Sequence, residues 1–186
     1  MTKTIVLFTT LLTCLVCQRS YAVEYMFDKT GQHVFITFKA SHLGFSYILG
    51  HFKDFDGTFS HDPAAPENST VNVTIDARSL DTDHAERDKH LRGSEYFDVA
   101  AYPSVTFTST GYTGSAKGGT LTGELNLRGV SKTVEIDVNK IGEGDDPWGG
   151  YRSGFEGNVI LDAADYGFPE WIGDVEVYLV VEGVRR

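Results

Sequence analysis

The sequence predicts an all-β protein, a closed antiparallel barrel of about eight strands with one short helix. Apolar and polar side chains alternate with a period of two residues through most of the chain, as expected for strands with one apolar face. Turn-forming residues separate the alternating runs, and one segment has a helix-forming composition instead. Because closure leaves no strand edge exposed, we expect the strands to form a barrel.

The N-terminal segment has the organisation of a secretory signal peptide. Lys3 supplies a positive charge, residues 5–16 form an apolar stretch, and Ser20-Tyr21-Ala22 is a small-x-small cleavage site. The apolar stretch is shorter than the about 20 residues that a membrane-spanning helix needs. We therefore expect a signal peptide over residues 1–22, cleaved after Ala22, and one barrel domain over 23–186 with no transmembrane segment.

The mature chain lacks cysteine and is strongly acidic. Cys14 and Cys17 both lie in the signal segment, so stability must come from burial rather than from disulfides. An exported chain with no cysteine favours the bacterial periplasm. Without Lys3 and Arg19, 14 basic residues remain against 26 acidic ones, a formal net charge of −12. A field of this sign repels phosphate backbones, so nucleic acid is not an expected partner.

The expected strands follow the alternating runs. These runs occupy residues 23–27, 34–38, 55–59, 71–75, 105–107, 121–127, 134–138, 151–161 and 175–181. Turn chemistry between them includes Asp62-Pro63 and the segment 142–147. The period is broken from Asp81 to Leu91, where good helix formers follow a possible cap at Asp81 or Thr82. We expect a short surface helix there, placed as a lid over one barrel end.

The sequence leaves open whether the barrel interior is filled or hollow. An eight-stranded barrel is just wide enough to be filled by side chains or to hold one small ligand. Gly57, Gly123, Ser153 and Gly157 interrupt the large residues of the alternating runs. Small inward residues leave space for a guest, but glycine also marks bulges and corners where a sheet bends. Both interpretations stand.

Signs of catalysis are weak. The chain has no Gly-x-Ser-x-Gly or His-Glu-x-x-His motif, and the mature chain has no thiol nucleophile. A periplasmic metal-dependent enzyme is the alternative function, using either His42 with His51 or His84 with Asp88, which lie four residues apart on the expected helix. The simpler interpretation is a solvated helix face and histidines in turns, so we expect no catalytic residue and no metal.

Several short motifs follow one another along the chain. They are Ser41-His42-Leu43-Gly44-Phe45-Ser46, Gly50-His51-Phe52-Lys53-Asp54-Phe55-Asp56-Gly57, Ile75-Asp76, His90-Leu91-Arg92, Tyr102-Pro103, Arg128-Gly129-Val130-Ser131-Lys132 and Asp146-Pro147-Trp148-Gly149. In this order they resemble the YceI-like family, and the resemblance spans nearly the whole mature chain. It implies a lipocalin-like extended barrel that binds a polyisoprenoid or an isoprenoid quinone along its interior, for transport, storage or sensing. It implies no enzyme activity and no cofactor besides the bound lipid, and a homodimer is compatible with it.

The resemblance and the aromatic pattern together suggest a set of lipid-binding residues. The candidates for the apolar wall are Phe35 or Phe38, Phe45, Phe52, Phe107, Phe155 and Phe168. At the polar end we expect His42, Ser46, Arg92 and Arg152. Trp148 either plugs a barrel end or gates its mouth. Which phase of each alternating run faces inward is not decided by the sequence.

Overall fold

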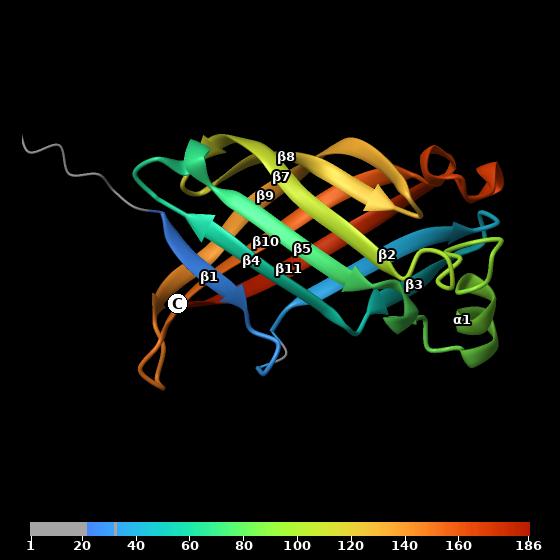
Figure 1. Cartoon of the computed structure of the whole chain (residues 1–186), viewed down its shortest axis with the longest axis horizontal. Helices are drawn as coiled ribbons and strands as arrows, with labels where there is room; N and C mark the ends of the chain where they lie inside the picture. The colour runs from blue at the N-terminus through green and yellow to red at the C-terminus, as the bar shows by residue number, and fades with distance from the viewer. Residues whose placement is uncertain (1–21, 32) are drawn as a thin grey trace, which may run out of the picture.

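The computed structural model describes residues 22–31 and 33–186 as a long β-barrel (Figure 1). The expected signal peptide, apart from Ala22, lies outside the described residues. The strands are β1 (Val23–Phe27), β2 (Phe35–His42), β3 (Ser46–Phe52), β4 (Phe55–His61), β5 (Thr70–Asp76), β6 (Leu80–Asp81), β7 (Ser104–Ser115), β8 (Gly118–Leu127), β9 (Val130–Asp145), β10 (Tyr151–Asp162) and β11 (Asp174–Arg185). The helical elements are α1 (Ala85–Leu91) and the short 3-10 turns η1 (Pro66–Asn68), η2 (Ala77–Ser79), η3 (Ala163–Tyr166) and η4 (Glu170–Ile172).

Eight strands close the barrel, as the sequence predicts. Their order is β1-β4-β5-β7-β8-β9-β10-β11, and the pairing of β1 with β11 completes the ring. The strands β2, β3 and β6 continue the sheet from β11. The first half of β11 pairs with β2, with Val175 opposite Ala40, and its last residues pair with β1, with Arg185 opposite Tyr25. β1 and β2 therefore lie end to end beside the same strand, β11.

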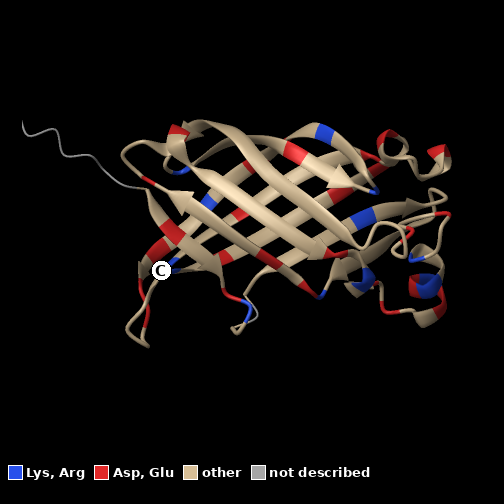
Figure 2. Cartoon of the chain, viewed as in Figure 1, with Lys and Arg blue, Asp and Glu red and all other residues tan. Residues whose placement is uncertain are grey.

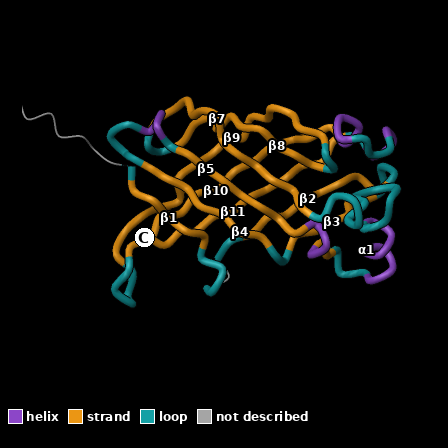
Figure 3. Tube along the Cα trace, in the orientation of Figure 1, coloured by secondary structure: helices purple, strands orange, loops and turns teal. Residues whose placement is uncertain are grey.

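The barrel has two different ends. Figure 3 shows α1 and several long loops gathered at one end, which we call the α1 end. The chain terminates at the opposite end, which we call the C-terminal end. Because β10 and β11 are long and pair with each other throughout, they connect the two ends.

Helix α1 is shorter than the sequence predicts and starts at Ala85 rather than near Asp81. Asp81 belongs to β6, where it lies opposite His51 of β3. The N-cap is His84, whose Nδ1 accepts a hydrogen bond from the Arg87 backbone N–H at 3.2 Å. The extended backbone of β6 is needed for strand pairing, so the helix can begin only after it.

The apolar phase of each strand faces the barrel interior. Tyr25, Phe27 and Phe59 form one buried cluster near the C-terminal end, in which the rings of Tyr25 and Phe59 stack at 4.8 Å. A second buried cluster consists of Phe107, Leu121 and Ile136 on the neighbouring strands β7, β8 and β9. Charged residues alternate with these positions along many of the strands (Figure 2). This arrangement is what period-two alternation requires of a barrel.

Most inward glycines accommodate aromatic rings from nearby strands. A Cβ atom on Gly57 would lie 2.5 Å from the ring of Phe27, and one on Gly123 would lie 2.4 Å from the ring of Phe107. Such separations are too short for carbon atoms in contact, which prefer about 3.5–4.0 Å. These two glycines therefore allow a ring to lie flat against the sheet, and the space beside them is filled.

Candidate functional site

An apolar cavity of about 300 Å³ runs along the barrel interior. Residues from every strand except β6 line it, with further wall residues from the loops of the α1 end. The middle of the wall is aliphatic and includes Val73, Leu125, Ile136, Val159 and Leu179. Such a wall offers an elongated guest burial without hydrogen bonds, at about 0.8 kcal/mol per methylene removed from water.

Four aromatic rings connect into a network across the α1 end of the cavity. Phe38 of β2 packs on Phe52 of β3 at 6.0 Å, and Phe52 meets Phe97 edge to face at 5.8 Å. Phe97 then meets Phe168 edge to face at 5.1 Å, and the Arg128 guanidinium lies 5.3 Å from the centre of the Phe168 ring. Since Phe97 and Phe168 belong to loops rather than strands, half of this network sits on the less regular part of the fold.

The C-terminal end of the cavity contains a buried histidine. His61 is 5% exposed, and its Nδ1 lies 3.3 Å from the Ser69 hydroxyl. Its ring meets Phe155 edge to face at 5.2 Å, and Nε2 has no hydrogen-bond partner among the described residues. Burial, and next the nearby Lys140 ammonium, lower the pKa of His61 below its ordinary value of 6.5. A neutral imidazole is therefore the main polar group on this part of the wall.

An ion pair lies next to this histidine. Lys140 and Glu143 of β9 pair at 2.8 Å, with side chains only 12% and 28% exposed. The Lys140 ammonium also lies 5.9 Å from the Phe155 ring centre. Ser153, directly opposite Glu143, is fully buried, and its hydroxyl has no partner in the described part of the chain. The C-terminal end of the cavity thus combines the neutral hydrogen-bonding groups of His61 and Ser153 with an ion pair of zero net charge.

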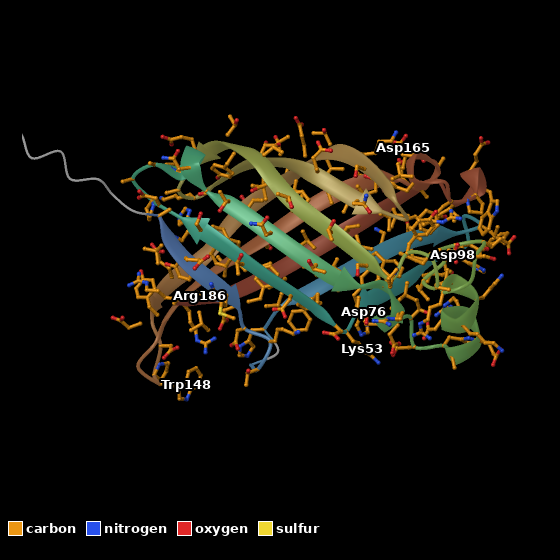
Figure 4. The ribbon with its side chains drawn as sticks, viewed as in Figure 1. Lys53, Asp76, Asp98, Trp148, Asp165 and Arg186 are labelled. Atoms are coloured by element: carbon orange, nitrogen blue, oxygen red, sulfur yellow. The ribbon has the colours of Figure 1, made fainter. Side chains whose placement is uncertain are left out.

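Arg152 lies outside the cavity, on the outward phase of β10. Its guanidinium bonds to Asp28, to Glu182 and, at 2.8 Å, to Asp146. These carboxylates raise the pKa of Arg152, with Asp28 contributing most. Trp148 is 77% exposed and lies 5.4 Å from the same guanidinium; Figure 4 places it beyond the C-terminal end of the barrel. This cluster joins the loop after β1 to β10 and β11.

The remaining residues predicted from sequence divide into two groups. Wall positions are occupied by Phe38, Phe52, Phe107, Phe155 and Phe168. Four residues are exposed and absent from the wall, namely Phe35, His42, Phe45 and Ser46. Phe35 and Phe38 are three positions apart in one strand, so only one of them can face inward. Arg92 is also off the wall, and its guanidinium donates to the backbone oxygen of Leu80.

His61 is absent from the lipid-binding residues that the sequence predicts. The signal was present, because His61 continues the inward phase Phe55, Gly57 and Phe59 by one more step. The motif containing His42 lies at the opposite end of the barrel. His42 lies at the end of β2, where its side chain is exposed.

Potential metal ligands gather at one place in the described part of the chain. Asp28, His33 and Glu182 bring one ligand atom each within 4.8 Å of one another, but Asp28 and Glu182 already bind Arg152. The pairs proposed for a metal-dependent enzyme, His42 with His51 and His84 with Asp88, do not belong to this group. Asp88 accepts hydrogen bonds from the Thr82 backbone and hydroxyl at 2.8 and 2.6 Å.

Among the described residues, no helix is long and apolar enough to cross a membrane.

Comparison with known proteins decides the family. The YceI-like domain matches residues 25–183, nearly all of the barrel. The chain belongs to the YceI-like family. This YceI-like protein is 48% identical over 169 residues to a UPF0312 protein of Pectobacterium atrosepticum, covering 89% of this chain and 88% of the relative. It is 46% identical over 172 residues to a UPF0312 protein of Pseudomonas aeruginosa, covering 90% of each.

Solved structures share the barrel of this YceI-like protein. The Campylobacter jejuni YCEI protein is 31% identical, with a TM-score of 0.72 and coverage of 78% of this chain and 90% of that one. A polyisoprenoid binding domain from Saccharophagus degradans is 19% identical, with a TM-score of 0.63 and coverage of 89% and 100%. Burkholderia cenocepacia BcnA is 21% identical, with a TM-score of 0.74 and coverage of 84% and 98%. At these lower identities the likeness concerns the fold alone.

Proposed function

We propose that this YceI-like protein binds a long apolar lipid of the polyisoprenoid class inside the barrel. The observation that carries the proposal is the continuous apolar wall, which extends from Phe97 and Phe168 at one end to His61 at the other. The similarity in fold to a domain described as polyisoprenoid binding supports the same ligand class. The role is binding rather than catalysis, because the wall offers burial to a guest and few groups that transfer protons.

A polyisoprenoid suits the shape and chemistry of this wall. The cavity is long and mainly aliphatic, and its volume lies at the lower end of the range of about 300–1,000 Å³ for ligand pockets. A five-carbon prenyl unit contributes about 4 kcal/mol when it leaves water, before the entropy of ordering the guest is subtracted. A few units are therefore enough for tight binding without hydrogen bonds. Quinone-type and alcohol-type prenyl lipids both fit this description.

The cellular role that follows is the shielding of a water-insoluble lipid in an aqueous compartment. The N-terminal signal peptide expected from the sequence supports a location in the periplasm, where a prenyl lipid needs a carrier to leave a membrane. Transport, storage and sensing of the lipid all use the same site. The acidic surface of the mature chain supports solubility during that role.

Lipid extraction tests the proposal directly. Protein purified without unfolding is expected to release a prenyl lipid into organic solvent, as detected by mass spectrometry. Delipidated protein is expected to bind added geranylgeraniol, and at 100 times the Kd this adds about 2.7 kcal/mol to the free energy of unfolding. For a domain of this size the melting temperature then rises by about 5–11 °C. An empty extract together with an unchanged melting temperature contradicts the proposal.

A further inference from the structure

The hairpin between β2 and β3 carries apolar side chains at its tip. Phe45 is 88% exposed and Leu43 is 68% exposed. The Phe45 backbone N–H donates to the His42 oxygen at 3.0 Å, which closes a tight turn through Leu43 and Gly44. Loop tips are normally polar, so two large apolar side chains in water at this position need a physical reason.

The backbone conformation at this tip does not favour leucine. Leu43 and Gly44 both have positive φ, 54° and 75°, as in a type I′ turn, which favours Asn-Gly. A leucine in the left-handed region costs roughly 1–2 kcal/mol. Asparagine at position 43 therefore suits the fold better, and the leucine side chain has no packing role that offsets the strain, because it is mostly exposed. The apolar side chains of the tip are therefore suited to contact with a surface outside the protein.

A second chain segment presents an apolar side chain at the same end. Trp171 in η4 is 67% exposed. Val175 of β11 lies opposite Ala40 of β2, so the residues just before β11 and those just after β2 both lie at the α1 end, as Figure 1 shows. We call Leu43, Phe45 and Trp171 the apolar tip.

The apolar tip adjoins the wall of the cavity along the chain. Ala40, two residues before the hairpin turn, and Ile172, the neighbour of Trp171, both line the cavity. No Lys, Arg, Asp or Glu occurs from residue 42 to residue 49, so this hairpin tip is drawn in tan in Figure 2. The hairpin thus offers burial without carrying the charges that orient a protein partner.

We propose that the apolar tip inserts into the surface of a lipid bilayer, with the α1 end of the barrel against the membrane. Aromatic and aliphatic side chains at a loop tip suit the boundary between head groups and acyl chains. The acidic mature chain is repelled by anionic lipid, so burial drives the contact and zwitterionic lipid is the matching surface. Docking in this orientation places the aromatic network of Phe38, Phe52, Phe97 and Phe168 next to the bilayer.

The two tryptophans provide an internal test of orientation. Trp148 and Trp171 are the only tryptophans in the chain, and both are mostly exposed. Trp148 lies at the C-terminal end (Figure 4), and η4, which contains Trp171, lies at the α1 end (Figure 1). Trp148→Phe leaves Trp171 as the sole reporter, and Trp171→Phe leaves Trp148. With phosphatidylcholine vesicles, Trp171 emission is expected to shift to the blue and to be quenched by brominated lipid. Trp148 emission is expected to stay unchanged. An equal response from both residues, or none from Trp171, overturns the proposal.

Substitutions at the tip separate docking from folding. Leu43→Asn and Phe45→Ser are each expected to weaken vesicle co-flotation at least tenfold, and Leu43→Asn is also expected to raise the melting temperature because it relieves the turn. The matched control is Phe35→Ser, which removes another exposed phenylalanine (51% exposed) at the far end of β2. Flotation of Phe45→Ser at the wild-type level overturns the proposal. So does a solution dimer that Phe45→Ser dissociates in the absence of vesicle binding, because a second copy then covers the tip.

Docking and lipid binding are measured separately. Phe45→Ser leaves the cavity wall intact, so geranylgeraniol is expected to raise its melting temperature as in the wild type. Vesicle binding that disappears while geranylgeraniol binding persists supports the docking proposal. Failure of geranylgeraniol binding in the wild type contradicts the proposed function and does not affect the flotation result.

Discussion

Gly157 offers a direct test of whether the barrel is hollow. It is buried on the inner face of β10, and it belongs to the cavity wall. A Cβ atom there would lie 3.1 Å from Ile136 Cγ2 and 3.6 Å from Leu179 Cδ1. The first contact is tight by a few tenths of an ångström and the second is ordinary. Gly157→Leu is therefore expected to extend its side chain into the cavity without displacing the backbone.

The magnitude follows from burial and chain entropy. The about three carbon atoms beyond Cβ contribute about 2.4 kcal/mol when buried. Replacing glycine in a strand adds about 0.5–1 kcal/mol, and ordering the leucine removes a similar amount. Part of the gain is lost at the tight Ile136 contact, so we expect the guest-free protein to gain about 1–2 kcal/mol. For a domain of this size the melting temperature then rises by about 2–8 °C, while the Kd for geranylgeraniol rises at least tenfold.

Thermal unfolding with and without geranylgeraniol measures both effects. The matched control is Gly123→Leu, because a Cβ there would lie 2.4 Å from the Phe107 ring and 2.7 Å from the Thr108 backbone oxygen. That variant is expected to lose about 1–3 kcal/mol through overpacking. If Gly157→Leu is destabilised as strongly as Gly123→Leu and still binds geranylgeraniol with wild-type affinity, the reasoning about a hollow interior is refuted.

Three further predictions concern polar groups. The pKa of His61 is lowered in the folded protein. As pH drops below about 6.5, the histidine is therefore protonated in the unfolded chain before it is protonated in the folded protein. The free energy of unfolding then falls by at most about 1.4 kcal/mol per pH unit. Urea unfolding across this range should show a shallower decline in His61→Gln. Arg152→Met leaves Asp28 buried without its cation and is expected to lose about 2–3 kcal/mol near neutral pH. Because Arg152 lowers the pKa of Asp28 from 3.8, this loss should shrink as pH falls below that value. Asp88→Ala removes the carboxylate oxygen that accepts hydrogen bonds from both the Thr82 backbone N–H and the Thr82 hydroxyl, so hydrogen exchange in α1 should accelerate and stability should fall by about 1.5–3 kcal/mol.

Each of these has a contrary outcome. Equal pH slopes for His61→Gln and the wild type mean that the imidazole is not held neutral by burial. A constant deficit for Arg152→Met from neutral to acidic pH means that the charge on Asp28 is not the cause. Unchanged exchange in α1 after Asp88→Ala means that packing alone holds the helix.

The strands were readable from the sequence because they follow from local alternation, whereas the phase of each run that faces inward was not. Runs such as Val71, Val73 and Ile75 can bury only one face, and the structure places that face inside the barrel. The sequence did not show that β1 and β2 share one side of β11, because this arrangement depends on how both strands pair with the distant β11. The start of α1 was missed for the same reason, because the pairing of Asp81 with β3 outweighs its local helix-capping preference.

The sequence by itself determined an all-β barrel with an apolar interior, because the period of two sets which side chains share a face and closure removes the edges. Only the tertiary structure decided which groups meet across that interior. Phe45 and His42 stand at an exposed turn, Arg152 is held outside by three carboxylates, and His61 is the neutral polar group on the wall. These placements depend on neighbours that are far apart in sequence, and no local pattern carries that information.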